Sequence, residues 1–338
     1  MIDETPTPTR SRSLRYATIA CAAIVVIAAV VIGITFSSGS ALPVSNASYK
    51  CVPGPQIPQL KPGKNGTLTT TYGSFTATFR ATEPGNAPEN GLDTGTPFNG
   101  TLTMTQGGTT WTLPRPANPN VAQINVMCVI AFQRERHPGV MVEGFTGGAH
   151  CCEVPVIYLY NHVENRYAKV VDMSPNNYKD PHAFDDNEGF IPKVVGHQVL
   201  LTTGDGQFSY AFGCYACEVL PIVLDSVGTD GLSDVTPQYP SLVAADARAT
   251  WKYVLGSVKA ETAAVPRIVP LPFGFLAPWV ADECVLGRGA SAWSAVLRLQ
   301  REGKLNDALY HQYATNRGSF VANLRSFLLR TDYCTGQI

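Results

Sequence analysis

Two short stretches of the chain carry thiols at close spacing. In "FTGGAHCCEVPVIYLY" the imidazole of His150 precedes the adjacent cysteines Cys151 and Cys152. In "GCYACEVLPIVL" the pair Cys214 and Cys217 forms a C-x-x-C. Thiolate and imidazole are the preferred ligands of zinc, and C-x-x-C is a spacing used by thiol-disulfide oxidoreductases. The chemistry predicted by these residue types is therefore disulfide bonding, thiol-disulfide exchange or metal binding.

The pairing of the adjacent cysteines stays open at this point. If Cys151 and Cys152 open a strand, their side chains point to opposite faces and seek different partners. A bridge between them would be strained, because consecutive Cα atoms lie only about 3.8 Å apart, below the usual range for bridged cysteines. Gly147 and Gly148 still allow an irregular turn that holds such a bridge. The C-x-x-C is followed by a strand-like run rather than a helix, which disfavours a redox enzyme.

The whole set of cysteines indicates an oxidising compartment. The chain has nine cysteines. Cys21 lies in an apolar N-terminal segment, which leaves eight cysteines in the rest of the chain. An even number of cysteines in an exported chain favours disulfides over zinc. We expect Cys284 and Cys334, which flank the last predicted helices, to bridge each other. The eight cysteines predicted to form disulfides are Cys51, Cys128, Cys151, Cys152, Cys214, Cys217, Cys284 and Cys334.

The N-terminal apolar segment predicts a membrane anchor. Residues 16–36 carry no charge over about the twenty residues that a helix needs to cross a bilayer. Arg10, Arg12 and Arg15 precede the segment, so the positive-inside rule places the N-terminus in the cytoplasm. A cleaved signal peptide is the alternative, because small residues follow at 39–41. We expect a single-pass cell-membrane protein whose bulk lies outside the cytoplasm.

Composition excludes one class of partner and supports a folded chain. The 338 residues are 45 % hydrophobic and 15 % charged, which is typical of globular proteins. The formal net charge is only -1, so the chain lacks the basic field that binds phosphate backbones. We expect no nucleic-acid partner.

The spacing of the apolar residues changes near residue 240. Before it, runs such as "GTLTTTYGSFTATFRAT" alternate threonine with aromatic residues, which predicts antiparallel strands and hairpins. After it, apolar residues recur three and four apart, which predicts helices. The predicted fold class is mainly β, with antiparallel propeller-blade-like or sandwich sheets and a C-terminal α-helical unit. The predicted segments are 1–15 cytoplasmic tail, 16–36 transmembrane anchor, 37–49 linker, 50–240 β-rich exported domain and 241–338 helical unit.

A weak internal repeat links the two thiol stretches. Each follows a strand and a glycine loop and precedes Glu-Val, a proline and another strand, so that Pro155 corresponds to Pro221. Each unit would suit one propeller blade or β-meander. Two units are too few for a closed propeller, and the N-terminal strands are expected to supply a third sheet.

One acidic stretch invites a calcium interpretation. In "FDDNEGFIP" the residues Asp185, Asp186 and Glu188 supply hard oxygen donors before Gly189. The stretch lacks the first and closing ligands of a calcium-binding loop, where Phe184 and Val195 stand. We favour a turn with acidic side chains and no cofactor, and keep calcium as the alternative.

Several of these stretches resemble segments of a known group of proteins. "GGAHCC", "DDNEG", "TTGDGQFSYAF", "DVTPQYP" and the "WVADECVLG" to "SFLLRTDYC" end resemble a group of uncharacterised bacterial exported proteins. That group is loosely related to integrin-type (VCBS/FG-GAP-like) propeller-repeat proteins. The resemblance spans about residues 139–338 and implies an extracytoplasmic β-rich domain with a helical tail, without an activity. It also favours short-range bridges within each thiol stretch over cross-pairing between them.

The predicted role is non-catalytic. We expect a cell-envelope module that binds a protein or polysaccharide through its β loops, with His150, Cys151, Cys152, Cys214 and Cys217 as candidate binding residues. Signatures of hydrolases, P-loops and dinucleotide-binding sites do not occur in the sequence. The alternative is an exported thiol-disulfide or metal-dependent enzyme that uses the same cysteines.

Overall fold

The structure is a computed structural model, and it describes ten ranges of the chain. These are residues 48–53, 66–82, 99–114, 123–132, 136–145, 153–172, 189–213, 217–261, 272–313 and 318–338. They all belong to one compact unit, Leu42–Ala264 together with Val269–Ile338. Within these ranges, no helix combines the length and the apolar character needed to cross a membrane. The predicted anchor at 16–36 lies outside the described residues.

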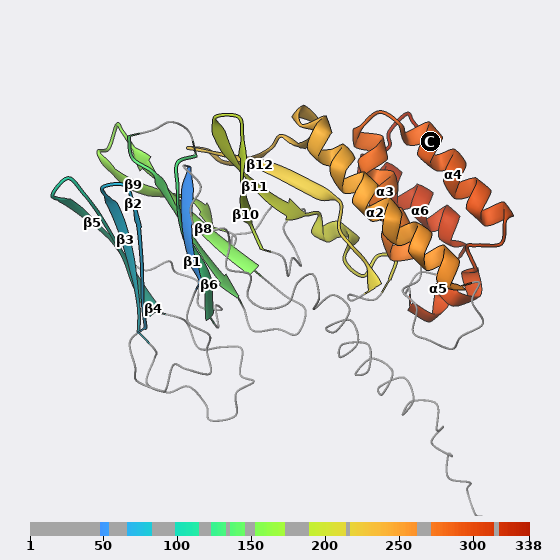
Figure 1. Ribbon diagram of the computed structural model, residues 1–338, viewed down its shortest axis with the longest axis horizontal. Helices are drawn as coiled ribbons and strands as arrows, with labels where there is room; N and C mark the ends of the chain where they lie inside the picture. Colours follow the sequence, from blue (N-terminus) through green and yellow to red (C-terminus); the bar gives the residue numbers. More distant parts are fainter. Residues whose placement is uncertain are drawn as a thin grey trace, which may run out of the picture. The chain divides into compact units, whose positions relative to one another are not determined.

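Sheet A is the five-stranded antiparallel sheet that contains the strands on either side of the first thiol stretch (Figure 1). Its strands are β1 (Tyr49–Pro53), β6 (Gln123–Ile130), β7 (Gly139–Phe145), β8 (Glu153–Asn161) and β9 (Arg166–Asp172), hydrogen-bonded in that order. Every residue of β8 from Val154 to Tyr160 is buried. A strand buried on both faces carries a continuous apolar run instead of an alternating one, which explains the sequence of β8.

Sheet B is formed by the threonine-rich part of the chain. Its strands, in hydrogen-bonded order, are β2 (Gly66–Tyr72), β3 (Phe75–Thr82), β4 (Asn99–Gln106) and β5 (Thr109–Pro114). Phe75, Ala77 and Phe79 alternate along β3 and are buried. Thr69 and Thr78 lie on the opposite face and pair across the strands with hydroxyls 3.2 Å apart, whereas Thr70 is buried. The period-two pattern therefore selects one buried and one solvent-facing side.

Sheet C repeats the strand order of sheet A. Its strands, in hydrogen-bonded order, are β10 (Ile191–Val195), β11 (Gln198–Gly204), β12 (Ile222–Gly228) and β13 (Gly231–Asp234). The thiol stretch connects β7 to β8 in sheet A and β11 to β12 in sheet C, each time followed by a hairpin. This is the order that the internal repeat predicts, and sheet B is the third sheet supplied by the N-terminal strands.

One hydrophobic core contains residues of all three sheets. Phe79 and Leu102 from sheet B, Met141 and Ile157 from sheet A, and Leu201 from sheet C belong to it, and all are at most 2 % exposed. The sheets therefore bury their apolar faces in a common interior, which is the main source of stabilisation for a β part of this kind.

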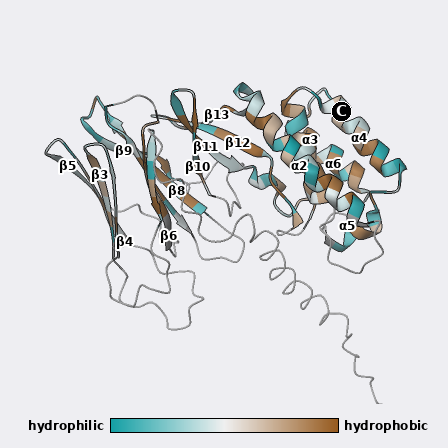
Figure 2. Cartoon of the chain, viewed as in Figure 1, coloured by the Kyte–Doolittle hydropathy of each residue, from teal (hydrophilic) through white to brown (hydrophobic). Residues whose placement is uncertain are grey.

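The C-terminal part is helical and has a second core. Its helices are α2 (Pro240–Glu261), α3 (Phe273–Val285), α4 (Gly289–Arg301), α5 (Asp307–Tyr313) and α6 (Phe320–Arg330). Figure 2 shows hydrophobic and hydrophilic residues intermixed along α2, α4 and α6, as expected of helices with one buried stripe. Phe273, Val280 and Leu324 lie in this core together with Phe208, which follows β11. The structure therefore has mainly antiparallel sheets with a C-terminal helical part, which confirms the predicted fold class at that level.

Candidate functional site

Most of the predicted site residues lie outside the described ranges. This holds for His150, Cys151, Cys152 and Cys214, and for the calcium candidates Asp185, Asp186 and Glu188. Within the described ranges, no group of three or more His, Cys, Asp or Glu side chains is arranged to hold a metal ion. The structure does describe the strands of sheets A and C to which these stretches are attached.

Two of the predicted stretches attach to the same end of sheet A. Phe145, the last residue of β7, pairs with Glu153, the first residue of β8. Asp172, the last residue of β9, pairs with Val156 near the start of β8. The connection with the adjacent cysteines and the connection with the acidic residues therefore both attach at the end of sheet A marked by Phe145 and Glu153, which we call the cysteine end.

A buried carboxylate sits next to the cysteine end. Glu143 on β7 is 4 % exposed, and its Oε2 accepts a hydrogen bond of 2.9 Å from the backbone N–H of Phe190. Gly189 has φ +63°, and a Cβ there would lie 2.1 Å from Oε1 of Glu143. Only glycine fits this close approach without strain. The contact holds the residues that follow the acidic stretch against sheet A, so Glu143 has a structural role.

Cys217 is the one candidate binding residue that the structure describes. It is disulfide-bonded, and its partner lies outside the described residues, because the other four described cysteines pair with one another. Gly274 in the first turn of α3 lies so close that a Cβ there would be 2.5 Å from the carbonyl oxygen of Cys217. The N–H of Val219 donates to the carbonyl of Gly274 over 3.3 Å. This end of the C-x-x-C stretch is therefore half-buried and packed against a helix.

Two disulfides join described residues, one in each part of the fold. Cys51 and Cys128 are directly opposite each other on β1 and β6. The predicted bridge between Cys284 and Cys334 is present and ties α3 to the end of the chain. All four cysteines are at most 5 % exposed. Buried bridges of this kind are structural rather than reactive.

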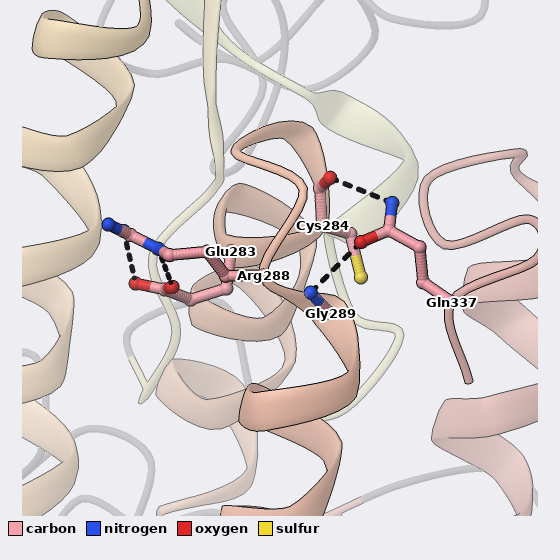
Figure 3. Close-up of polar contacts among 5 residues, drawn as sticks. All are labelled: Glu283, Cys284, Arg288, Gly289 and Gln337. Carbon is pink, nitrogen blue, oxygen red and sulfur yellow. Dashed lines mark hydrogen bonds and ion pairs between the residues drawn. The ribbon is translucent and has the colours of Figure 1, made fainter.

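Next to the second disulfide, Gln337 makes two hydrogen bonds to the backbone of Cys284 and Gly289, which we call the clasp (Figure 3). The amide of Gln337 accepts from the N–H of Gly289 and donates to the carbonyl of Cys284, both over 2.9 Å. Beside it, the guanidinium of Arg288 pairs with the carboxylate of Glu283 through two nitrogens, one of them at 2.8 Å. The two contacts of Gln337 satisfy backbone groups at the turn between α3 and α4, where helix ends leave donors and acceptors without intrahelical partners.

A buried aspartate links sheet C to the end of the chain. Asp205 follows β11 directly and is fully buried. Its Oδ1 accepts from the N–H of Gln207 over 2.9 Å, and its Oδ2 accepts from the hydroxyl of Tyr333 over 2.7 Å. Burial raises the pKa of Tyr333 well above its usual value, and the carboxylate of Asp205 raises it further. Tyr333 therefore stays protonated and acts as a donor.

Two acids on different helices affect each other electrostatically. Asp282 on α3 is buried, and Asp246 on α2 is half-buried. Burial raises the pKa of Asp282 well above its ordinary value of 3.8, and the neighbouring Asp246 raises it further. Burial also raises the pKa of Asp246, so the environment of both carboxyls favours the neutral form.

Sequence reasoning did not single out these acids. Asp205, Asp246, Asp282 and Tyr333 stand in no recognisable motif, and the pairs Asp246–Asp282 and Asp205–Tyr333 join residues from different elements of the chain. The only local signal was an aspartate directly after a buried strand in "TTGDG". Asp205 has hydrogen-bond partners inside the fold, whereas Oδ2 of the buried Asp282 has none among the described residues.

Comparison with known proteins gives two similarities. The family model described as "sll0997 C-terminal domain" matches residues 243–332, which run from α2 to the end of α6. A solved structure described as "Structure of a Xanthomonas Type IV Secretion System related protein" is 12 % identical, covers 54 % of this chain and 99 % of that chain, and has a TM-score of 0.26. At that TM-score the likeness carries no argument. None of the curated proteins matches the chain. The resemblance to exported GGAHCC proteins remains a prediction.

Proposed function

We propose that the chain is a membrane-anchored, extracytoplasmic binding module that contacts a protein or polysaccharide of the cell envelope and carries out no catalysis. The observation that supports this proposal best is the state of the cysteines. All five described cysteines are in disulfides, and four of them lie inside the two cores. Buried disulfides persist in oxidising compartments, which favours export by the apolar segment at 16–36.

The hydrogen bonds of the buried carboxylates also support a non-catalytic role. Glu143 accepts a hydrogen bond from the backbone N–H of Phe190, and Asp205 accepts one from the hydroxyl of Tyr333. Groups committed to internal hydrogen bonds stabilise a scaffold and are poorly placed to reach a substrate. The cysteine end of sheet A, where the connections at 146–152 and 173–188 attach, is the proposed contact surface.

The state of all cysteines tests the non-catalytic part of the proposal. The full chain, purified in detergent, is alkylated before and after mild reduction, and its cysteines are mapped by peptide mass spectrometry. We expect eight bridged cysteines that resist mild reductant as well as the buried Cys284–Cys334 pair does. Selective opening of Cys151, Cys152, Cys214 or Cys217 would instead support the exported thiol-disulfide enzyme.

A binding assay tests the proposed surface. The full chain is sedimented with purified cell-wall sacculi, once unchanged and once with residues 146–150 replaced by a Gly-Ser segment of equal length. We expect the replacement to reduce the bound fraction. The matched control is Val163→Ala at the opposite end of sheet A, where the side chain is 95 % exposed. Equal loss in both variants, or no binding by the unchanged chain, would contradict a polysaccharide contact at the cysteine end.

A further inference from the structure

The opposite end of sheet A brings two histidines together. His137 immediately precedes Pro138 and β7, and His162 follows the last residue of β8. β7 and β8 are antiparallel, with Val140 opposite Tyr158, so the start of one strand and the end of the other meet. The ring centroids of His137 and His162 are 6.0 Å apart. We call this the histidine end of sheet A, and none of the functions considered above uses it.

The hydrogen bonds around His137 determine which ring nitrogen is available. Nε2 of Gln106 donates to the carbonyl of Arg136 over 3.1 Å, which orients the Gln106 amide. Its Oε1 then faces Nδ1 of His137 at 2.7 Å. Because an amide oxygen only accepts, Nδ1 of the neutral ring carries the hydrogen, and Nε2 keeps its lone pair. This assignment comes from the hydrogen-bond network.

Aromatic side chains hold His137 in place. Its ring stacks on that of Tyr160 with centroids 3.9 Å apart and an angle of 25° between the planes. Trp111 meets both rings edge-on, at 5.9 Å from His137 and 5.7 Å from Tyr160. Tyr160 is 7 % exposed, whereas His137 is half-buried. The imidazole is therefore oriented by packing on one face and by Gln106 at one edge.

A separate set of contacts positions His162. The side chain of Asn161 accepts hydrogen bonds from the N–H groups of Val163 at 2.9 Å and Glu164 at 3.1 Å, which closes the turn around His162. The hydroxyl of Tyr160 donates to Asn165 at the far side of the same turn. The turn is thereby held in one conformation, while the imidazole of His162 is exposed and its ring lies 5.0 Å from that of Tyr160.

We propose that His137 and His162 form a binding site for a divalent late transition-metal ion, with copper(II) bound most tightly and water in the remaining positions. Imidazole suits copper, nickel and zinc, and copper(II) stands highest in the affinity order of divalent ions. Gln106 acts as the outer-shell partner that fixes the tautomer and direction of His137, an arrangement typical of metal-ligating histidines. With two protein ligands the site stays open and exchangeable.

The geometry needs only a small adjustment. A ring bound through Nε2 has its centroid about 3.2 Å from the metal, so two neighbouring ligands bring their centroids to about 4.5–5.2 Å. The observed 6.0 Å is about 1 Å wider. Rotation of the exposed His162 side chain closes this gap without moving the strands. The neighbouring Arg136 is also exposed, and its positive charge lowers the affinity without blocking coordination.

Copper(II) titration of the untagged full chain in detergent tests the proposal. We expect one high-affinity equivalent whose electron paramagnetic resonance spectrum shows nitrogen ligands. His137→Ala and His162→Ala each lower the affinity at least about tenfold, and Gln106→Leu lowers it about 10- to 100-fold, the range found for outer-shell partners of metal ligands. In the metal-free chain, long-range proton–nitrogen spectra should show hydrogen on Nδ1 of His137.

Three of the other histidines serve as matched controls. Of the six in the chain, these are His182, His197 and His311. Their alanine variants are expected to bind copper(II) as the unchanged chain does, and thermal unfolding without metal verifies that each variant is folded. Unchanged binding by both His137→Ala and His162→Ala would overturn the proposal, as would an equal loss in any control. Because the assay measures metal binding alone, its outcome is independent of the envelope-binding proposal.

Discussion

Among the described residues, the β part and the helical part of this protein each contain one disulfide between two buried cysteines, and further contacts differ between the two parts. In the sheets, most pairings join strands that are neighbours in sequence, and the hydroxyls of threonines such as Thr69 and Thr78 pair across adjacent strands. In the helical part, residues near the end of the chain reach far back, as when Tyr333 binds Asp205, 128 positions earlier. In addition to their hydrophobic cores, the sheets therefore have local ladders, and the helical part has a few long-range polar contacts.

Removing each disulfide in turn is expected to change the free energy of unfolding most, and it compares the β part with the helical part directly. The bridges Cys51–Cys128 and Cys284–Cys334 span 77 and 50 residues. Loop-closure entropy predicts a loss of about 4.5 kcal/mol for the first and about 4.1 kcal/mol for the second when both cysteines become serine. Urea unfolding of the full chain measures both losses.

The two losses are informative as a pair. Similar values would mean that each bridge acts mainly on the unfolded chain. A much smaller loss for Cys284→Ser with Cys334→Ser would mean that the clasp formed by Gln337 holds the end of the chain without the bridge, because that clasp joins the same two segments.

A smaller effect is expected from the contact between sheet C and the end of the chain. Tyr333→Phe removes the donor to the buried carboxylate of Asp205 and should lower the free energy of unfolding by about 1.5–3 kcal/mol. Tyr253→Phe is the matched control, because Tyr253 is 52 % exposed and its loss should cost less than about 0.5 kcal/mol. Equal values for the two variants would mean that Asp205 is satisfied without Tyr333.

The smallest effect is expected for Asp282→Asn. This substitution alters how the free energy of unfolding depends on pH, and its effect is smallest under acidic conditions. The pKa of Asp282 is raised in the folded protein, so its contribution is complete below the ordinary value of 3.8 and is lost as pH rises through the raised value. The variant keeps a neutral side chain and should not show this loss. Urea midpoints measured from acidic to alkaline pH check the difference between the two proteins. A parallel profile would mean that the pKa of Asp282 is not raised in the folded protein.

Several features of the fold could be predicted from the sequence because they depend on neighbouring residues. Alternation of threonine with aromatic residues predicts the strands of sheet B, and spacing by three and four predicts the helices after residue 240. The bridge between Cys284 and Cys334 was expected because the two cysteines flank the predicted helices. The order of strand, cysteine loop, strand and hairpin in sheets A and C could be predicted as well, because the two thiol stretches repeat each other, whereas the pairing of β1 with β6 was not predicted.

The sequence by itself therefore determined most of the secondary structure, the repeat and one disulfide, since each of these is encoded in short-range patterns, whereas the short helix α5 was not predicted. Only the tertiary structure decided that Asp246 meets Asp282, that Tyr333 meets Asp205 and that His137 lies beside His162. These pairs join residues from different elements, and no local pattern marks them. Their partners are chosen by the packing of whole elements, because a buried polar group must find its hydrogen bond wherever the core places one.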